Sequence, residues 1–203
     1  TPPGFIFTAK VPGAITHEKV LKDCQAEFTT FLNNISLLGD RLGPLLLQFP
    51  YFNRNVFSSR APFEKLLTPF LKTLPKEFKF ALEIRNKNWI SWDFLELLRD
   101  HSVAFALVAQ AWMPRIDTLA KALDLVTSDF AYVRFIGDRR AIEAKTKRWD
   151  KLIEDKTQEM SVWVNELKKI TDKGVKTYAF FNNHYAGFAP GSVKQFEDLW
   201  EKS

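Results

Sequence analysis

The sequence predicts an α/β fold in which strands and helices alternate along the chain. Six short, nearly continuous apolar segments indicate buried parallel strands, and helical stripes separate them. Polar residues stand at the ends of these strands: Lys10, Gln48, Glu83 with Arg85, Gln110, Arg134 and Asn182. Because α/β barrels build their sites from such strand ends, we predict a TIM-like (β/α)8 barrel. Six units are two short of a closed barrel, so we expect residues 1–203 to be a single domain that lacks the first two or so βα units.

The first half of the chain contains three of the predicted strands: Phe5–Ala9, closed by Lys10, then Leu45–Phe49 and Phe78–Ile84. A helix capped by Thr16 should follow the first strand and end at Gly39. Its apolar stripe has helical spacing: Cys24, Phe28, Phe31, Ile35 and Leu38. A second stripe follows the next strand: Phe63, Leu66, Leu67, Phe70 and Leu74. Pro69 falls inside that stripe and should bend or split the helix.

The second half should contain the other three strands: Val103–Ala109, Ala131–Ile136 and Val175–Phe181. Ser91 is expected to cap a short helix ahead of them, and residues 114–129 to form a short helix and a loop. A long helix is predicted from about Trp149 to Asp172, with Gly174 as its stop. Ser192 should open the last helix, with Gln195 completing a capping box.

The composition is that of a globular chain without a membrane segment. Of its 203 residues, 46% are hydrophobic and 26% charged, and no apolar run approaches the length of about 18 residues that a bilayer span requires. The amino terminus lacks the basic start and apolar core of a signal peptide. A single cysteine, Cys24, excludes an internal disulfide and fits a reducing compartment. We therefore expect a cytoplasmic protein.

The net charge of +5 favours an anionic partner, such as nucleic acid or a phosphorylated metabolite. Most lysines, however, lie on predicted helix faces beside acidic residues. The densest basic cluster, from Asp138 through Arg139 and Arg140 to Arg148, falls in a predicted loop. A solvated surface is therefore the alternative to an anion site.

Stretches along nearly the whole chain resemble one family. They are Phe5–Lys10 with Ile15-Thr16-His17, Leu42–Pro50, Ala81–Arg85 with Trp89, Tyr132–Gly137, and Asn182-Asn183 with Gly187 and Ala189. Together they resemble the DUF72 family of YecE-like proteins of unknown function. The resemblance implies a (β/α)8 barrel whose first strands carry Gly-x-Ser-Gly-Trp and Glu-x-Asn motifs. Neither occurs here, which agrees with absent first units. The family more often has His where this chain has Ile136, and it brings no established reaction.

Strand alternation predicts which side chains share a face. Glu83 and Arg85 should share one, and Asn182 should share another with His184, while Asn183 points the opposite way. We expect the polar set to converge near the barrel top: Lys10, Gln48, Glu83, Arg85, Arg134 and Asn182. Glu83 and His184 are the predicted catalytic residues. The predicted substrate-binding residues are Lys10, Gln48, Arg85, Arg134, Asn182, Asn183 and Gly187. A purely structural network of ion pairs and amides is the alternative.

The chemistry of the predicted site favours an anion over a metal. Glu83, Asp138 and His184 are too few ligands for a hydrolytic metal centre, and no nucleotide-binding glycine motif occurs, so we expect neither metal nor cofactor. Phosphate could bind at Gly137–Arg140 and at Gly187–Ser192, although Gly191-Ser192 can equally be a plain helix start.

Three classes of function follow. The first is an enzyme of the hydrolase or lyase/isomerase type, with an acid/base carboxylate and a small anionic, phosphorylated or sugar-like substrate. The second is a protein that binds nucleic acid or cleaves phosphodiesters, by analogy with barrel nucleases. The third is a non-catalytic protein that senses a ligand or binds a partner. The sequence does not indicate the oligomeric state.

Overall fold

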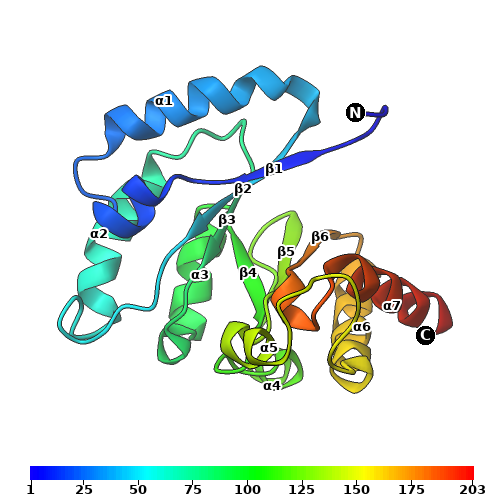
Figure 1. Ribbon diagram of the computed structural model, residues 1–203. Coiled ribbons are helices and arrows are strands. Elements are labelled where there is room, and N and C mark those ends of the chain that lie inside the picture. Colours follow the sequence, from blue (N-terminus) through cyan, green and yellow to red (C-terminus); the bar gives the residue numbers. More distant parts are fainter. The chain divides into compact units, whose positions relative to one another are not determined.

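The structure, a computed structural model, describes residues 1–203, which divide into two compact units, residues 1–104 and 105–203. Each unit is described by itself. Both are built from parallel strands with helices beside them (Figure 1). The predicted α/β class is therefore confirmed. No helix has both the length and the apolar composition that crossing a membrane requires.

The first unit contains three parallel strands in sequential order: β1 (Phe7–Lys10), β2 (Leu42–Gln48) and β3 (Phe80–Glu83). In the pairing register, Lys10 lies beside Leu46, and Gln48 lies beside Glu83. The middle of β2 is buried on both of its faces, which explains why its sequence is a continuous apolar run without alternation. The strands begin and end within a few residues of their predicted bounds.

The helices of the first unit bury part of each predicted stripe, and the other stripe residues are half-buried; the buried ones are Cys24, Phe28, Phe63, Leu67 and Phe70. They are α1 (Gln25–Ile35), α2 (Arg60–Lys72) and α3 (Trp92–Asp100), with the short helices η1 (Ala14–Glu18), η2 (Ser36–Arg41) and η3 (Lys87–Trp89). Phe28 of α1 is in contact with Phe70 of α2, their ring centroids lying 4.9 Å apart. The hydroxyl of Ser91 accepts a hydrogen bond from Phe94 N, so the predicted cap of α3 is confirmed.

One helix prediction in this unit was wrong, and of the bend or split expected at Pro69 the structure excludes the split. No single helix runs from Thr16 through Cys24, because Val20, Leu21 and Asp23 have positive φ and interrupt it between η1 and α1. Nor does Pro69 split α2, which continues to Lys72. The missing amide of Pro69 removes one hydrogen bond near the helix end, where burial of the final apolar turn can compensate.

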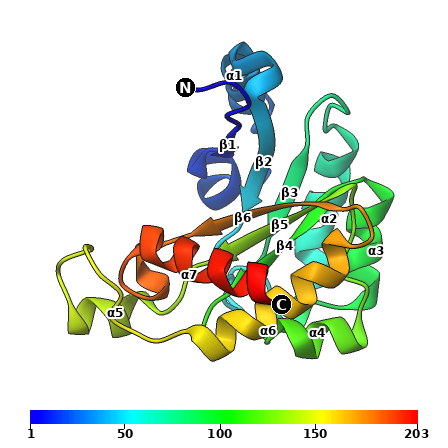
Figure 2. The same cartoon turned by 90° about the vertical axis from the view of Figure 1, so that its right-hand side faces the viewer.

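The second unit has three parallel strands, β4 (Ala104–Ala109), β5 (Phe130–Phe135) and β6 (Lys176–Phe181). Its helices are α4 (Ile116–Ala122), α5 (Arg139–Lys145), α6 (Thr157–Thr171) and α7 (Ala189–Lys202), with the short helix η4 (Asn183–Tyr185). Helices α6 and α7 lie side by side (Figure 2). The core around Phe135 contains the rings of Trp163, Phe181 and Tyr185.

Three predictions in the second unit need correction. The basic segment after Asp138 is helix α5 and not a loop, because Asp138 Oδ1 accepts a hydrogen bond from Ala141 N at 3.1 Å and caps it. The long helix begins at Thr157 and not near Trp149, because the amides of Ile153 and Glu154 donate to Ala186 O instead of to a helical neighbour.

The third correction concerns the start of the last helix. Helix α7 begins at Ala189, ahead of Ser192, whose hydroxyl is buried and donates to Phe188 O at 3.1 Å. Gln195 forms no capping box with it, since its side-chain amide donates to Thr157 Oγ1 of α6 at 2.7 Å. Gln195 therefore links two helices.

Candidate functional site

The centre of the strand-end cluster in the first unit is a buried ion pair. Glu83 ends β3 with none of its surface exposed. Arg85 Nε and Nη2 each lie 2.6 Å from Glu83 Oε1. A carboxylate can remain ionised away from water when a cation binds it this closely. The pair therefore fixes a guanidinium at the carboxyl end of β3.

Two further predicted residues share the face of Glu83. The register places Gln48 directly beside Glu83, and it places Lys10 beside Leu46, two residues before Gln48 on the same strand. Neighbouring residues in a parallel register point to the same side of the sheet, so Lys10, Gln48 and Glu83 share one face. Lys10 is exposed, and no hydrogen bond or ion pair engages its ammonium group. Arg85 lies beyond the end of β3, so the register does not place it on this face.

His17 belongs to this cluster, although the sequence reasoning assigned it only to a helix start. It lies in η1, and its Nδ1 is 2.8 Å from the hydroxyl of the buried Thr16. Partial burial lowers the pKa of His17, and the positive charges of Lys10 and Arg85 lower it further. The effect of both cations shows that they lie within electrostatic range of the imidazole. The Ile15-Thr16-His17 motif directly after the first strand was the signal that could have identified it.

Hydrogen bonds and ring stacking connect the loop that follows β2 to the loop that follows β3. Asn86 accepts a hydrogen bond from Phe52 N at 2.9 Å and donates one to Phe52 O at 2.8 Å. The Phe52 ring stacks on Trp89, with the ring planes 21° apart. Arg60 donates to Trp89 O at 3.1 Å and to the hydroxyl of Ser91. These contacts hold the segment next to Arg85 in place and make the cluster a preorganised one.

The second unit has its own strand-end cluster, centred on His184 of η4. His184 Nδ1 lies 2.8 Å from Asn182 Oδ1, and Nε2 lies 3.1 Å from Glu143 Oε1. Glu143 also accepts a hydrogen bond from Arg139 Nε at 2.8 Å. Arg139 lowers the pKa of Glu143 most, burial opposes this, and His184 adds a smaller lowering. Both ring nitrogens of His184 thus face oxygen atoms, and the Trp149 ring packs edge-on against the imidazole.

Asn183 and two nearby glycines, Gly137 and Gly187, stabilise the structure of this unit. Asn183 Oδ1 accepts from Ala189 N at 2.7 Å and so caps α7, which agrees with the expectation that it braces a loop. Gly187 N donates to Asn183 O, and Gly137 N donates to Ala109 O. The two amides that we expected to receive a phosphate are therefore already bonded. Added Cβ atoms would overlap His184 at Gly137 and Ile153 at Gly187, so both glycines serve close packing.

Arg134 lies near the carboxyl end of β5 and is half-buried. The register places it beside Val108 and Phe180, on the face that also carries Tyr132. Tyr132 stacks on Phe180 with ring centroids 4.9 Å apart. No three His, Cys, Asp or Glu side chains gather into a group that could hold a metal ion.

Parallel strands with helices beside them, and with polar residues at their carboxyl ends, define the chain as an α/β protein. The sequence model of the DUF72 family, described as a protein of unknown function, matches residues 1–203. The chain therefore belongs to the DUF72 family.

Individual relatives agree with this assignment. The chain is 33% identical over 88 residues to the protein YecE of Escherichia coli, a match that covers 43% of this chain but only 30% of YecE. A solved DUF72 family protein of Thermotoga maritima superposes on 99% of this chain and 75% of its own, with 28% identity and a TM-score of 0.74. One of Enterococcus faecalis, at 21% identity and a TM-score of 0.67, supports the fold over 100% of this chain and 81% of its own.

Proposed function

We propose that this DUF72 protein binds a small anionic ligand at the carboxyl ends of the strands of the first unit, with Lys10 and Arg85 as its cationic contacts. The observation that carries this proposal is the exposed ammonium group of Lys10, which no side chain pairs, on the strand face that also carries Gln48 and Glu83. The pKa of His17 supports it: burial lowers this pKa most, and the positive charges of Lys10 and Arg85 lower it further, against a smaller opposing effect of Glu18. An anion bound there would replace repulsion by attraction.

The charges of the cluster support an anion more than a neutral ligand. Glu83 is fully buried and is held by Arg85, so it neutralises one cation while Lys10 has no partner. Gln48 lies beside Glu83 and adds an amide that can donate to ligand oxygens. A phosphorylated or sugar-like acid would suit this set of donors.

The groups of the strand-end cluster that could act as acid or base are His17 and Glu83. Glu83 is tightly paired, so we propose that it orients Arg85 and that His17 acts as the acid or base if a reaction follows. Glu83 as the acid/base of a hydrolase, lyase or isomerase is the competing assignment. In the second unit, both ring nitrogens of His184 are engaged by oxygen atoms. This histidine is therefore better suited to holding η4 against α5 than to transferring a proton.

Two broader expectations also stand as proposals. The parallel strands and the likeness to a solved DUF72 structure support a TIM-like (β/α)8 barrel as the parent fold. A reducing, cytoplasmic compartment is supported by the single buried cysteine, Cys24.

A thermal-shift screen can test the anion site. Phosphate, sulfate, simple sugar phosphates and small carboxylates would be added to the wild type, to Lys10→Met and to Lys76→Met, an exposed lysine in the loop before β3. We expect at least one anion to raise the Tm of the wild type and of Lys76→Met. Loss of one charged contact should weaken its binding to Lys10→Met by about tenfold. Equal shifts in all three proteins, or none in the wild type, would overturn the proposal.

Binding of single-stranded nucleic acid is a second candidate, favoured by exposed aromatic rings near the strand ends. Tyr51 follows β2 and is 66% exposed, and Trp92 opens α3 and is 64% exposed. Stacking of bases on such rings tolerates any sequence and accompanies binding that weakens steeply with salt. Fluorescence anisotropy with a labelled oligonucleotide at two salt concentrations distinguishes this from the small-ligand site, since Tyr51→Ala should weaken only oligonucleotide binding.

A further inference from the structure

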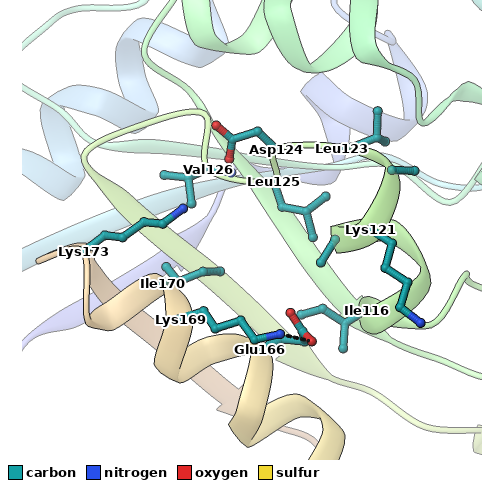
Figure 3. A pocket seen from close by; sticks show the side chains of 12 residues that line it. Ile116, Lys121, Leu123, Asp124, Leu125, Val126, Glu166, Lys169, Ile170 and Lys173 are labelled. Carbon is teal, nitrogen blue, oxygen red and sulfur yellow. Dashed lines mark hydrogen bonds and ion pairs between the residues drawn. The ribbon is translucent and has the colours of Figure 1, made fainter.

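A pocket of about 530 Å³ lies in the second unit, between α4, the segment that follows it and the end of α6 (Figure 3). Ile116, Leu125 and Ile170 supply its apolar surface, and each is less than a tenth exposed. Its volume falls in the range of small-molecule sites, about 300–1,000 Å³. None of its residues belongs to either strand-end cluster, so the pocket is independent of the proposed anion site.

The rim of the pocket carries lysines that are not all neutralised. Lys169 Nζ lies 2.7 Å from Glu166 Oε1, and this carboxylate is only 15% exposed. Lys173 extends across the edge of the pocket toward Val126 (Figure 3), and no hydrogen bond or ion pair engages its ammonium group. Lys121 stands on the α4 side and lies within electrostatic range of Asp117. Lys173 is therefore the cation that a ligand could pair with most directly.

We propose that this pocket binds a short amphipathic carboxylate. Its hydrocarbon part would cover Ile116, Leu125 and Ile170, and its carboxylate would face Lys173. The apolar floor supplies affinity through the area removed from water, and the lysine selects for the negative charge. Inorganic phosphate would gain nothing from the floor, and a cation would find Glu166 already paired with Lys169.

Chemical-shift mapping by NMR tests the proposal with hexanoate as the probe, and with acetate and hexanol as matched comparisons. Each methylene that leaves water should tighten binding by about a factor of four. Hexanoate should therefore bind at least about tenfold more tightly than acetate, and more tightly than hexanol, with the largest shifts at Leu125 and Ile170. Equal affinity for hexanoate and hexanol, equal affinity for hexanoate and acetate, or shifts elsewhere only would each overturn it.

Two variants test separately the contribution of the Lys173 charge and that of the pocket volume to hexanoate binding. Lys173→Met should weaken hexanoate binding by about two- to fivefold at low salt, as expected for a partly exposed ion pair, and Lys76→Met should leave it unchanged. Ala120 is an exposed residue of the pocket lining, so Ala120→Phe should fill the space without emptying the core and should abolish binding. Undiminished binding to a folded Ala120→Phe protein would show that the ligand binds elsewhere.

Discussion

The two units both place a histidine and a carboxylate near strand ends, but they use them in opposite ways. In the first unit the carboxylate, Glu83, belongs to a strand, is fully buried and holds Arg85. His17 remains outside that pair, with Nδ1 engaged by Thr16. In the second unit the carboxylate, Glu143, lies on helix α5, is about a third exposed and holds the histidine itself.

The difference shows which imidazole is suited to a ligand. His184 faces Asn182 through one ring nitrogen and Glu143 through the other, so it joins η4 to α5. The hydrogen bond of His17 is to a hydroxyl on its own short helix, and the charges near it come from Lys10 and Arg85. A histidine near the exposed ammonium group of Lys10 responds to an anion, whereas one held by two oxygens mainly stabilises a turn.

The largest expected effect comes from breaking the two carboxylate pairs in turn. Glu83→Gln leaves Arg85 without its counter-charge in a site that is 14% exposed. We expect a loss of unfolding free energy on the order of 3–5 kcal/mol. Glu143→Gln should cost far less, because water can solvate Arg139 once the pair is lost. Urea denaturation of both variants measures the difference, and equal losses would contradict the assignment of Glu83 as a buried structural anion.

The next effect concerns the close approach of Gly137 to the His184 turn. Gly137 has φ of 70°, and a Cβ added there would overlap His184 O and lie 2.5 Å from Tyr185 Cα. We expect Gly137→Ala to lower the unfolding free energy by about 2–3 kcal/mol, from backbone strain and overlap together.

Gly174→Ala is the matched control for this change. Gly174 also has a positive φ, 80°, but an added Cβ would meet nothing within 4 Å. Its cost should therefore be only the backbone strain, about 1 kcal/mol. If both variants lose the same stability in thermal or urea unfolding, then the contact between Gly137 and the η4 turn is not tight.

Strand faces could be predicted from the sequence because side chains alternate along any strand. That rule paired Glu83 with Arg85 along one strand, whereas the common face of Lys10, Gln48 and Glu83 follows from the pairing register of the structure. The separate short helix that carries His17 was not predicted, because a helical stripe does not reveal the positive φ values of Val20, Leu21 and Asp23 that separate it from α1. Glu143 was missed because the capping by Asp138 was not recognised, and a segment taken for a loop offers no face on which to place a carboxylate.

The smallest effect on stability, and the sharpest test of the comparison, comes from replacing each histidine by glutamine. The pKa of His17 in the folded protein lies below the value of about 6.5 that an unperturbed histidine has. Between this lowered pKa and a pH of about 6.5, the unfolded chain therefore binds more protons than the folded protein does. The contribution of His17 to stability falls as the pH falls through this range. His17→Gln should remove this loss, so that the wild type becomes less stable than the variant only toward acidic pH.

An anion bound near Lys10 and Arg85 should reverse the shift, because it stabilises the imidazolium form of His17. Its affinity for the wild type should then strengthen as the pH falls through the His17 titration, and this dependence should disappear in His17→Gln but persist in His184→Gln. NMR titration of the imidazole carbon-bound protons, with and without the anion, measures both quantities directly. If the pH dependence disappears in His184→Gln instead, the ligand-responsive histidine is the one in the second unit, and the contrast drawn between the two clusters is reversed.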